Sequence, residues 1–184
     1  AKAGVTTGEW AAALRRVYGE YRGPTGVALV IDTGGEDIDA VKRDVAALSE
    51  MVQDGDTILL DGGTTTYEVA RLLVGRPLQI VTNSLPVASL FSADTKTDLV
   101  LIGGYVYPRT GVSLGPYANQ MLEHLNERRT IHSVAGINDR GFYNSNLLLV
   151  ETERAMMKAA EEVIVVADSS KFGHQSLSHL AALD

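Results

Sequence analysis

Hydrophobic and polar positions alternate along the chain in blocks that favour helix and strand in turn. After an apolar series at helical spacing, the polar turn 54–56 ends the first of these helices, and the apolar run 57–60 predicts a strand buried on both faces. Strands that alternate with helices predict right-handed βαβ units, and therefore a mostly parallel sheet with helices on both faces. The helical series comprises Ile38, Val41, Val45, Leu48 and Val52.

The same alternation predicts the remaining elements. Thr65 and Glu68 fit a capping box at the start of a helix that continues to Leu73, and Ser84 with Pro86 begins the next helix. Further helices are expected at 115–125 and 150–161. Strands are expected at 78–81, 99–102, 131–135 and 163–167.

The first 35 residues are less clear. Trp10, Leu14 and Val17 suit an amphipathic helix, and residues 27–31 are a further candidate strand. This part is too short to form a second complete domain, so it is left unassigned, and residues 36–184 are taken as the functional domain.

Five apolar runs end in small or hydroxylated residues, at 61–66, 82–84, 103–104, 136–138 and 168–173. In an open parallel sheet the carboxyl ends of the strands lie on one edge, and ligands bind there. Glycine lets main-chain N–H groups approach an anion closely, and threonine, serine and asparagine add hydroxyl and amide partners. The pattern predicts a site for a polyhydroxylated or phosphorylated small molecule.

Segment 61–66 is the strongest of these signals, because a glycine turn before a helix presents free amides and a positive dipole end to a phosphate. It is neither a Walker A loop nor a dinucleotide-binding glycine motif. In 168–173, Lys171 could meet a phosphate as a point charge. The alternatives are a plain capped turn for the first segment and a surface lysine in the second. Gly103-Gly104 is followed by a loop 105–115 that could act as a flexible cover, but two glycines alone favour a simple tight turn.

Composition narrows the function. The chain has 184 residues, a net charge of −7 and a pI near 5.1, so it lacks the basic surface that binds nucleic acid. It has no cysteine, which suits the cytoplasm, and no membrane span or signal peptide is evident. The four histidines lack zinc-ligand spacing, and no nucleophile elbow is present. We therefore expect neither a metal nor another cofactor.

The polar segments, taken in order, resemble the sensor domain of DeoR-type bacterial transcription regulators. The resemblance covers residues 39–184 and rests on 56–65, 81–84, 101–104, 136–138 with Gly141, and 168–173. It implies the fold of ribose-5-phosphate isomerase, glucosamine-6-phosphate deaminase and the CoA transferases. It also implies a phosphorylated sugar as effector, a homo-oligomer, and a separate winged helix-turn-helix that reads operator DNA. No part of this sequence matches that DNA-binding pattern.

The resemblance and the strand ends together define the expected ligand-binding residues. In the helical segment 150–161, Glu151 and Arg154 fit the family pattern, whereas Glu153 stands where the family usually has a lysine. The expected residues are Asp61, Gly62, Gly63, Thr64, Thr65, Thr66, Thr82, Asn83, Ser84, Gly103, Gly104, Gly136, Asn138, Glu151, Arg154, Asp168, Ser170 and Lys171.

Three functions remain open at this point. The leading hypothesis is the effector-binding domain of a repressor of sugar metabolism, with no catalytic activity. The second is a sugar-phosphate isomerase or deaminase of the same fold, which requires a carboxylate base beside the bound carbon chain. The third is an assembly module with an inert pocket.

Overall fold

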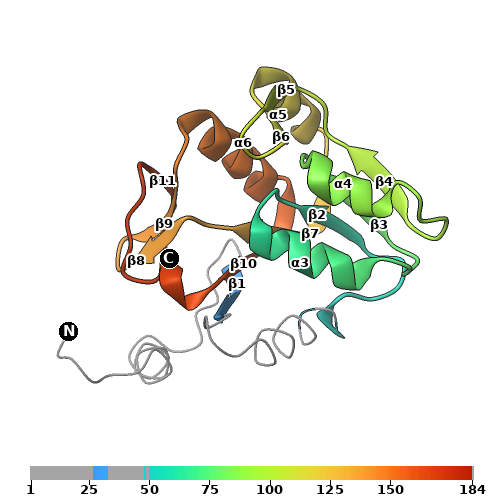
Figure 1. The fold of residues 1–184 in the computed structure, drawn as a ribbon, viewed down its shortest axis with the longest axis horizontal. Helices are drawn as coiled ribbons and strands as arrows, with labels where there is room; N and C mark the ends of the chain where they lie inside the picture. Colours follow the sequence, from blue (N-terminus) through green and yellow to red (C-terminus); the bar gives the residue numbers. More distant parts are fainter. Residues whose placement is uncertain (1–26, 33–47, 49, 184) are drawn as a thin grey trace.

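A computed structural model of the chain describes residues 27–32, 48 and 50–183 (Figure 1). The helix predicted around Trp10, most of the helix predicted from Ile38, and the turn 33–35 lie outside these residues. Within the described part, no helix has the length and apolar character needed to cross a membrane.

The centre of the fold is a six-stranded sheet in which all neighbours are parallel. This confirms the predicted parallel sheet, and it includes the candidate first strand. Leu60 lies opposite both Thr82 and Ile131, so neighbouring strands end close to one level. In spatial order the strands are β1 (Val27–Asp32), β10 (Ala160–Ala167), β7 (Glu127–Ser133), β2 (Thr57–Leu60), β3 (Gln79–Thr82) and β4 (Asp98–Leu101).

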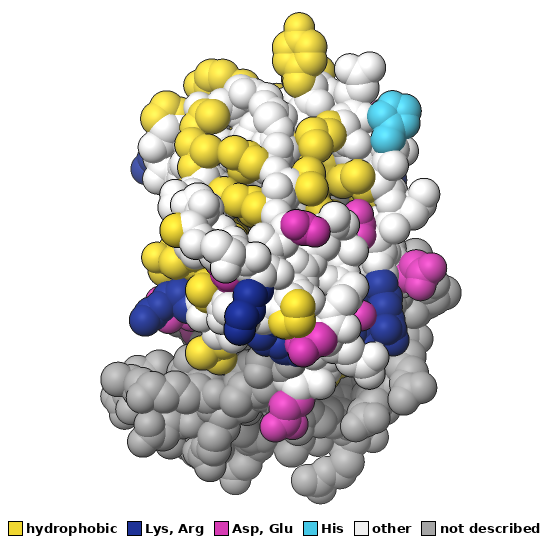
Figure 2. All heavy atoms as spheres, turned by 90° about the vertical axis from the view of Figure 1, so that its right-hand side faces the viewer, with side chains coloured by type: hydrophobic (Ala, Val, Ile, Leu, Met, Phe, Trp, Pro, Cys, Tyr) yellow, Lys and Arg dark blue, Asp and Glu magenta, His cyan; other side chains and the backbone are white. Residues whose placement is uncertain are grey.

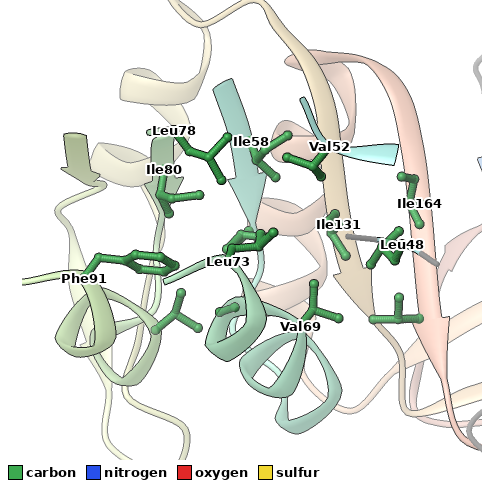
Figure 3. Packing of buried hydrophobic residues seen from close by; sticks show 14 residues of the cluster. Leu48, Val52, Ile58, Val69, Leu73, Leu78, Ile80, Phe91, Ile131 and Ile164 are labelled. Carbon is green, nitrogen blue, oxygen red and sulfur yellow. The ribbon is translucent and has the colours of Figure 1, made fainter. Parts of the chain in front are cut away.

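Among the described residues, helices cover both faces of this sheet. Ile58 and Leu60 pack in one apolar cluster with α3 (Thr64–Leu73) and α4 (Leu85–Phe91), as Figure 3 shows. Leu59, which lies between them, packs instead with α5 (Pro116–Leu122) and α6 (Leu147–Lys158). Because successive strand residues point to opposite faces, a run such as 57–60 must be apolar throughout. The predicted helices on both faces are confirmed.

Two small antiparallel sheets complete the described structure. One is the hairpin β5 (Tyr105–Tyr107) and β6 (Val112–Leu114). The flexible cover expected at 105–115 is therefore wrong, since these residues form an ordered hairpin whose Val112 and Leu114 side chains are buried. The other sheet holds β8 (Gly136–Asn138), β9 (Gly141–Asn144) and β11 (Ser178–Ala181), and a 3-10 turn, Ser169–Lys171, follows β10.

Several predicted boundaries shift. The strand expected at 131–135 begins at Glu127, because the buried Arg129 pairs with Glu162 of β10 and so allows a charged segment to enter the sheet. The helix expected at 150–161 begins at Leu147 after the cap Asn146, whose Oδ1 accepts hydrogen bonds from the N–H groups of Leu148 and Leu149 at 2.9 and 3.1 Å.

The proposed capping box at Thr65 and Glu68 is also wrong. Gly63 is the N-cap of α3, and its N–H donates to Oγ1 of Thr66 at 2.7 Å. The helix therefore begins at Thr64, two residues before the start that an N-cap at Thr65 implies.

Two neighbouring leucines at the end of α3 differ in burial, and substituting each of them tests the packing of the core. Leu73 is fully buried, whereas Leu72 is 48% exposed. We expect Leu73→Ala to lower the free energy of unfolding by about 2–5 kcal/mol, because it removes packed methyl groups and leaves a cavity. Leu72→Ala should change it by less than about 0.5 kcal/mol. Urea denaturation measures both, and equal losses would contradict this arrangement of α3.

Candidate functional site

The predicted polar segments follow the carboxyl ends of the strands of one parallel sheet. Segment 61–66 follows β2, 83–84 follows β3, 103–104 follows β4, and 168–171 follows β10. Because the strands are parallel, these segments lie along the same edge of the sheet, which is where ligands bind in open α/β folds (Figure 1). We refer to this edge as the carboxyl edge.

At the end of β2, packing by itself requires the two glycines. A Cβ atom on Gly62 would lie 2.1 Å from Cγ1 of Val112, and one on Gly63 would lie 1.7 Å from Oγ of Ser133. The Asp61 carboxylate is buried and accepts hydrogen bonds from the N–H and hydroxyl of Ser133 at 3.3 and 3.2 Å. These three residues therefore build the turn, whether or not a ligand approaches it.

The side chains of the first two residues of α3 have no hydrogen-bond partner among the described residues. Thr64 is exposed and Thr65 is partly exposed, and neither hydroxyl bonds to another residue in the part of the chain that the structure describes. Thr66, in contrast, is buried, and its hydroxyl donates to the carbonyl oxygen of Gly63 at 2.9 Å. Thr64 and Thr65 are thus the hydroxyl groups that this helix N-terminus offers to an anion.

Most polar side chains at the end of β3 and just after it form hydrogen bonds within the protein. The Thr82 hydroxyl donates to the Leu60 carbonyl at 2.7 Å, and Oγ of Ser84 caps α4 by accepting from the N–H of Val87. Asn83 is fully buried and donates through Nδ2 to the Ser113 carbonyl at 3.0 Å. Its Oδ1 atom has no partner among the described residues. In this loop, Oδ1 of Asn83 is therefore an acceptor that remains available to a ligand.

The two glycines after β4 differ from each other. A Cβ on Gly104 would lie 2.9 Å from Oγ of Ser113 and 3.0 Å from the Leu114 carbonyl oxygen, so packing forbids a larger residue. At Gly103 a Cβ would meet no described atom within 4 Å, and this residue does not need a left-handed backbone. The described structure gives no internal reason for glycine at 103, which leaves its main chain open to an incoming molecule.

The segment after β10 carries the part-exposed Lys171 ammonium beside the Asp168 carboxylate. Oδ1 of Asp168 accepts from the N–H of Ser170 at 2.9 Å and also from its hydroxyl. Partial burial raises the pKa of Asp168, but the bonds from Ser170 and the nearby Lys171 ammonium outweigh it, so the net pKa is lowered. Nζ of Lys171 lies 3.7 Å from Asp168 Oδ2 and is part-exposed. Such a contact leaves the lysine able to meet an anion.

Gly136 and Asn138 have clear roles in the fold. A Cβ on Gly136 would lie 2.5 Å from the His174 carbonyl oxygen, so this glycine allows the segment after β10 to pass closely over β8. Asn138 accepts a hydrogen bond from the N–H of Arg140 at 2.9 Å and closes the β8–β9 turn. The loop after Gly136 is thus an ordered hairpin.

Helix α6 presents different residues from those that the family pattern suggested. Glu151 and Arg154 lie on its exposed side. The Arg154 guanidinium donates to the carbonyl oxygens of Leu180 and His179 at 2.9 and 2.7 Å, and so fixes β11. The Arg154 guanidinium is thus engaged by the main chain of β11, and the role expected for Glu151 stays a prediction.

The buried side of α6 carries Glu153, which the sequence-based site omitted. Its Oε1 accepts from Nδ2 of Asn144 at 2.6 Å, and its Oε2 has no partner among the described residues. Burial, and secondarily the negative charge of Asp61, raise the pKa of Glu153 well above its usual value, while the Asn144 bond lowers it in part. The spacing of Val150, Glu153 and Met156 places Glu153 on the apolar stripe, and this signal could have identified it.

His132, near the end of β7, is the other overlooked group. Burial lowers its pKa, although the charge of Asp61 acts in the opposite direction. Nε2 lies 2.9 Å from the Thr130 hydroxyl, and Nδ1 has no described partner. Buried polar atoms are nearly always paired, so exceptions indicate a strained or ligand-dependent region. The described part of the chain has four, in Asn83, Ser113, His132 and Glu153.

A separate cleft of about 330 Å³ lies on the small sheet of β8, β9 and β11. The sequence did not predict this cleft. Its lining residues are Arg140, Tyr143, Gln175, Leu177 and His179. In the described residues, no group of three or more histidine or acidic side chains could hold a metal ion.

Comparison with solved structures identifies the fold of this chain. The structure aligns with a D-ribose-5-phosphate isomerase solved in complex with phospho-erythronic acid, with a TM-score of 0.51 and 14% identity, over 74% of this chain and 55% of that chain. It also aligns with eIF2B delta from Chaetomium thermophilum, with a TM-score of 0.53 and 15% identity, over 90% and 53% of the two chains. These likenesses show the fold, as the sequence predicted.

Residues 39–184 match the model of the DeoR C terminal sensor domain, and the chain belongs to this family. It is 37% identical over 138 residues to the transcriptional repressor AccR of Agrobacterium fabrum, covering 73% of this chain and 53% of the relative. It is 36% identical over 141 residues to a putative aga operon transcriptional repressor of Escherichia coli O157:H7, covering 75% and 52%. The chain spans about half the length of these relatives. The matched region is the sensor domain of this regulator family.

The buried Glu153 carboxyl predicts a specific pH dependence. With its pKa raised in the folded state, its contribution to stability is complete below the unfolded pKa and is lost as the pH rises toward the folded value. The loss can reach about 1.4 kcal/mol per pH unit. We expect Glu153→Gln, which keeps an acceptor for Asn144, to gain stability relative to wild type between pH 5 and pH 8.

Urea denaturation of both proteins at each pH measures this difference. The His132 contribution, which is lost as the pH falls through the lower range, is common to both proteins and cancels. A difference that stays constant with pH would mean that Glu153 is ionised in the folded protein.

Proposed function

We propose that this chain is an effector-binding domain that senses a phosphorylated sugar at the carboxyl edge. The observation that supports this most is the set of polar groups at that edge that have no partner within the described part of the chain. They include the Thr64 and Thr65 hydroxyls at the start of α3 and Oδ1 of Asn83. A ten-residue helix that begins on a glycine turn adds free N–H groups and a positive dipole end.

The phosphate and the sugar would use different parts of this edge. The N-terminus of α3 and the Lys171 ammonium favour a dianionic group, since charge-assisted hydrogen bonds are the stronger ones. Oδ1 of Asn83 and the open main chain at Gly103 favour hydroxyl groups. Thr82, Ser84 and the glycines at 62 and 63 hold these groups in place.

In the whole regulator, effector binding would change the affinity for operator DNA through a domain outside the matched region. Relatives named as transcriptional repressors support this role. A coupling on the order of 1–3 kcal/mol is typical of allosteric proteins. Because 105–115 and the segment after Gly136 are hairpins, the coupling would be transmitted by displacement of ordered strands. We place this activity in the cytoplasm, with the operator.

A thermal-shift panel of sugar phosphates and the matching free sugars tests the proposal. A ligand that binds only the folded state raises the melting temperature, so at least one sugar phosphate should do so more than its free sugar. Lys171→Ala and Thr64→Ala should weaken phosphate binding by about 1.5–3 kcal/mol, or roughly tenfold or more, and affect the free sugar less. Lys158→Ala, at the far end of α6, is the control.

Two glycine variants separate binding from folding. Gly103→Ala should reduce the ligand shift and leave the melting temperature of the free protein unchanged, because its Cβ meets nothing in the described structure. Gly62→Ala should lower the stability of the free protein by about 1–3 kcal/mol through overpacking. No shift with any sugar phosphate would favour the inert assembly module, and equal losses for phosphate and free sugar would remove Lys171 and Thr64 from the phosphate site.

A further inference from the structure

One side of the molecule carries exposed apolar side chains around the outer edge of β4. Figure 2 views the side on which Figure 1 shows β4, α4 and the β5–β6 hairpin, and most charged side chains there lie in its lower half. A contiguous apolar surface of this kind usually marks an interaction site. Its members are Leu85 (40% exposed), Leu101 (41%), Tyr105 (60%), Val106 (40%) and Tyr117 (79%), and we call them the β4 patch.

The elements that carry the β4 patch are joined directly. The N–H of Leu85, at the start of α4, donates to the Gly111 carbonyl in the hairpin at 2.9 Å. Ser84 also forms a β-bridge with Val112, and α5 follows β6 after one residue. The elements that carry the β4 patch are therefore neighbours in the fold.

Strand β4 is the last strand of the large sheet, and β3 is its only described partner. The N–H groups of Asp98 and Ile102 donate to β3, at 2.9 and 2.8 Å. Since alternate residues of a parallel strand face the same neighbour, Leu99 and Leu101 direct their N–H and C=O groups away from the sheet. A free edge of this kind is a template for pairing with another strand.

We propose that β4 pairs with β4 of a second copy of this chain, antiparallel and about a two-fold axis at Val100. In this register Leu99 lies opposite Leu101 of the second copy, and all the outward N–H and C=O groups of these residues are paired. The two Asp98 carboxylates then lie at opposite ends of the paired segment, so like charges do not meet. The β4 patch of each copy surrounds the junction.

A second copy fits this surface better than an unrelated partner. A two-fold interface is self-complementary, and a free edge strand satisfies its own copy without any further feature. A stable interface needs about 800 Å² per partner. The exposed parts of the two tyrosines, the two leucines and Val106, together with the strand edge, supply a large share of this area. The patch contains no charged residue that self-association would bury.

Sedimentation velocity of the 184-residue chain and of single variants tests this interface. Leu101→Pro removes an N–H that points outward, and proline is tolerated at such edge positions, so the fold should persist while the dimer dissociates at least tenfold more readily. Leu101→Ala, which keeps the N–H, should retain more of the dimer than Leu101→Pro. The control Leu177→Lys changes an exposed leucine next to β11 and should leave the dimer unchanged.

An engineered cysteine tests the register and does not depend on how the proline variant folds. The chain has no cysteine. Paired Val100 residues would have Cα atoms about 4.5 Å apart, within the range of a disulfide. Under mild oxidation Val100→Cys should form a covalent dimer and Leu177→Cys should not. A chain that is monomeric at every concentration, or a dimer in which Val100→Cys fails to cross-link, would overturn the proposal.

Discussion

The central constraint on this protein is that its parallel strands must be buried on both faces. Ile58 and Leu60 pack under α3 and α4, while Leu59 packs under α5 and α6. With helices on both faces, the parts of the sheet that remain available are its ends. The carboxyl ends are therefore where this fold can place loops with polar side chains, and the outer edge of β4 is where it can meet another strand.

The architecture was predictable because it follows from periodicity. The strand at 57–60 and the cap at Ser84 have the predicted positions, since each depends on neighbouring residues only. The hairpin at 105–115 was missed because its buried residues, such as Val112 and Leu114, are covered by contacts with distant segments. The composition of this segment favours a loop, but its contacts with distant parts of the chain stabilise a pair of strands.

The sequence predicted that the polar segments share one edge of the sheet, but not what each side chain does there. Strand ends indicated which segments share an edge, but not which side chains the fold would use for itself. Thr66, Thr82 and Ser84 bond to main-chain groups, whereas the hydroxyls of Thr64 and Thr65 have no partner among the described residues. Among the charged residues of α6, the helical period decides which are buried: Glu153 lies inward and Arg154 outward, where it fixes β11. Such assignments depend on distances that a sequence does not contain.

Hydrogen exchange with and without a saturating sugar phosphate tests most directly whether the carboxyl edge is the effector site. The account predicts slower exchange in segments 61–67, 83–85, 103–105 and 169–173, because a bound anion pairs with their N–H groups and excludes water. The cleft between Arg140 and His179 serves as an internal reference and should keep its exchange rates. Protection at that cleft, with none at the carboxyl edge, would contradict the account.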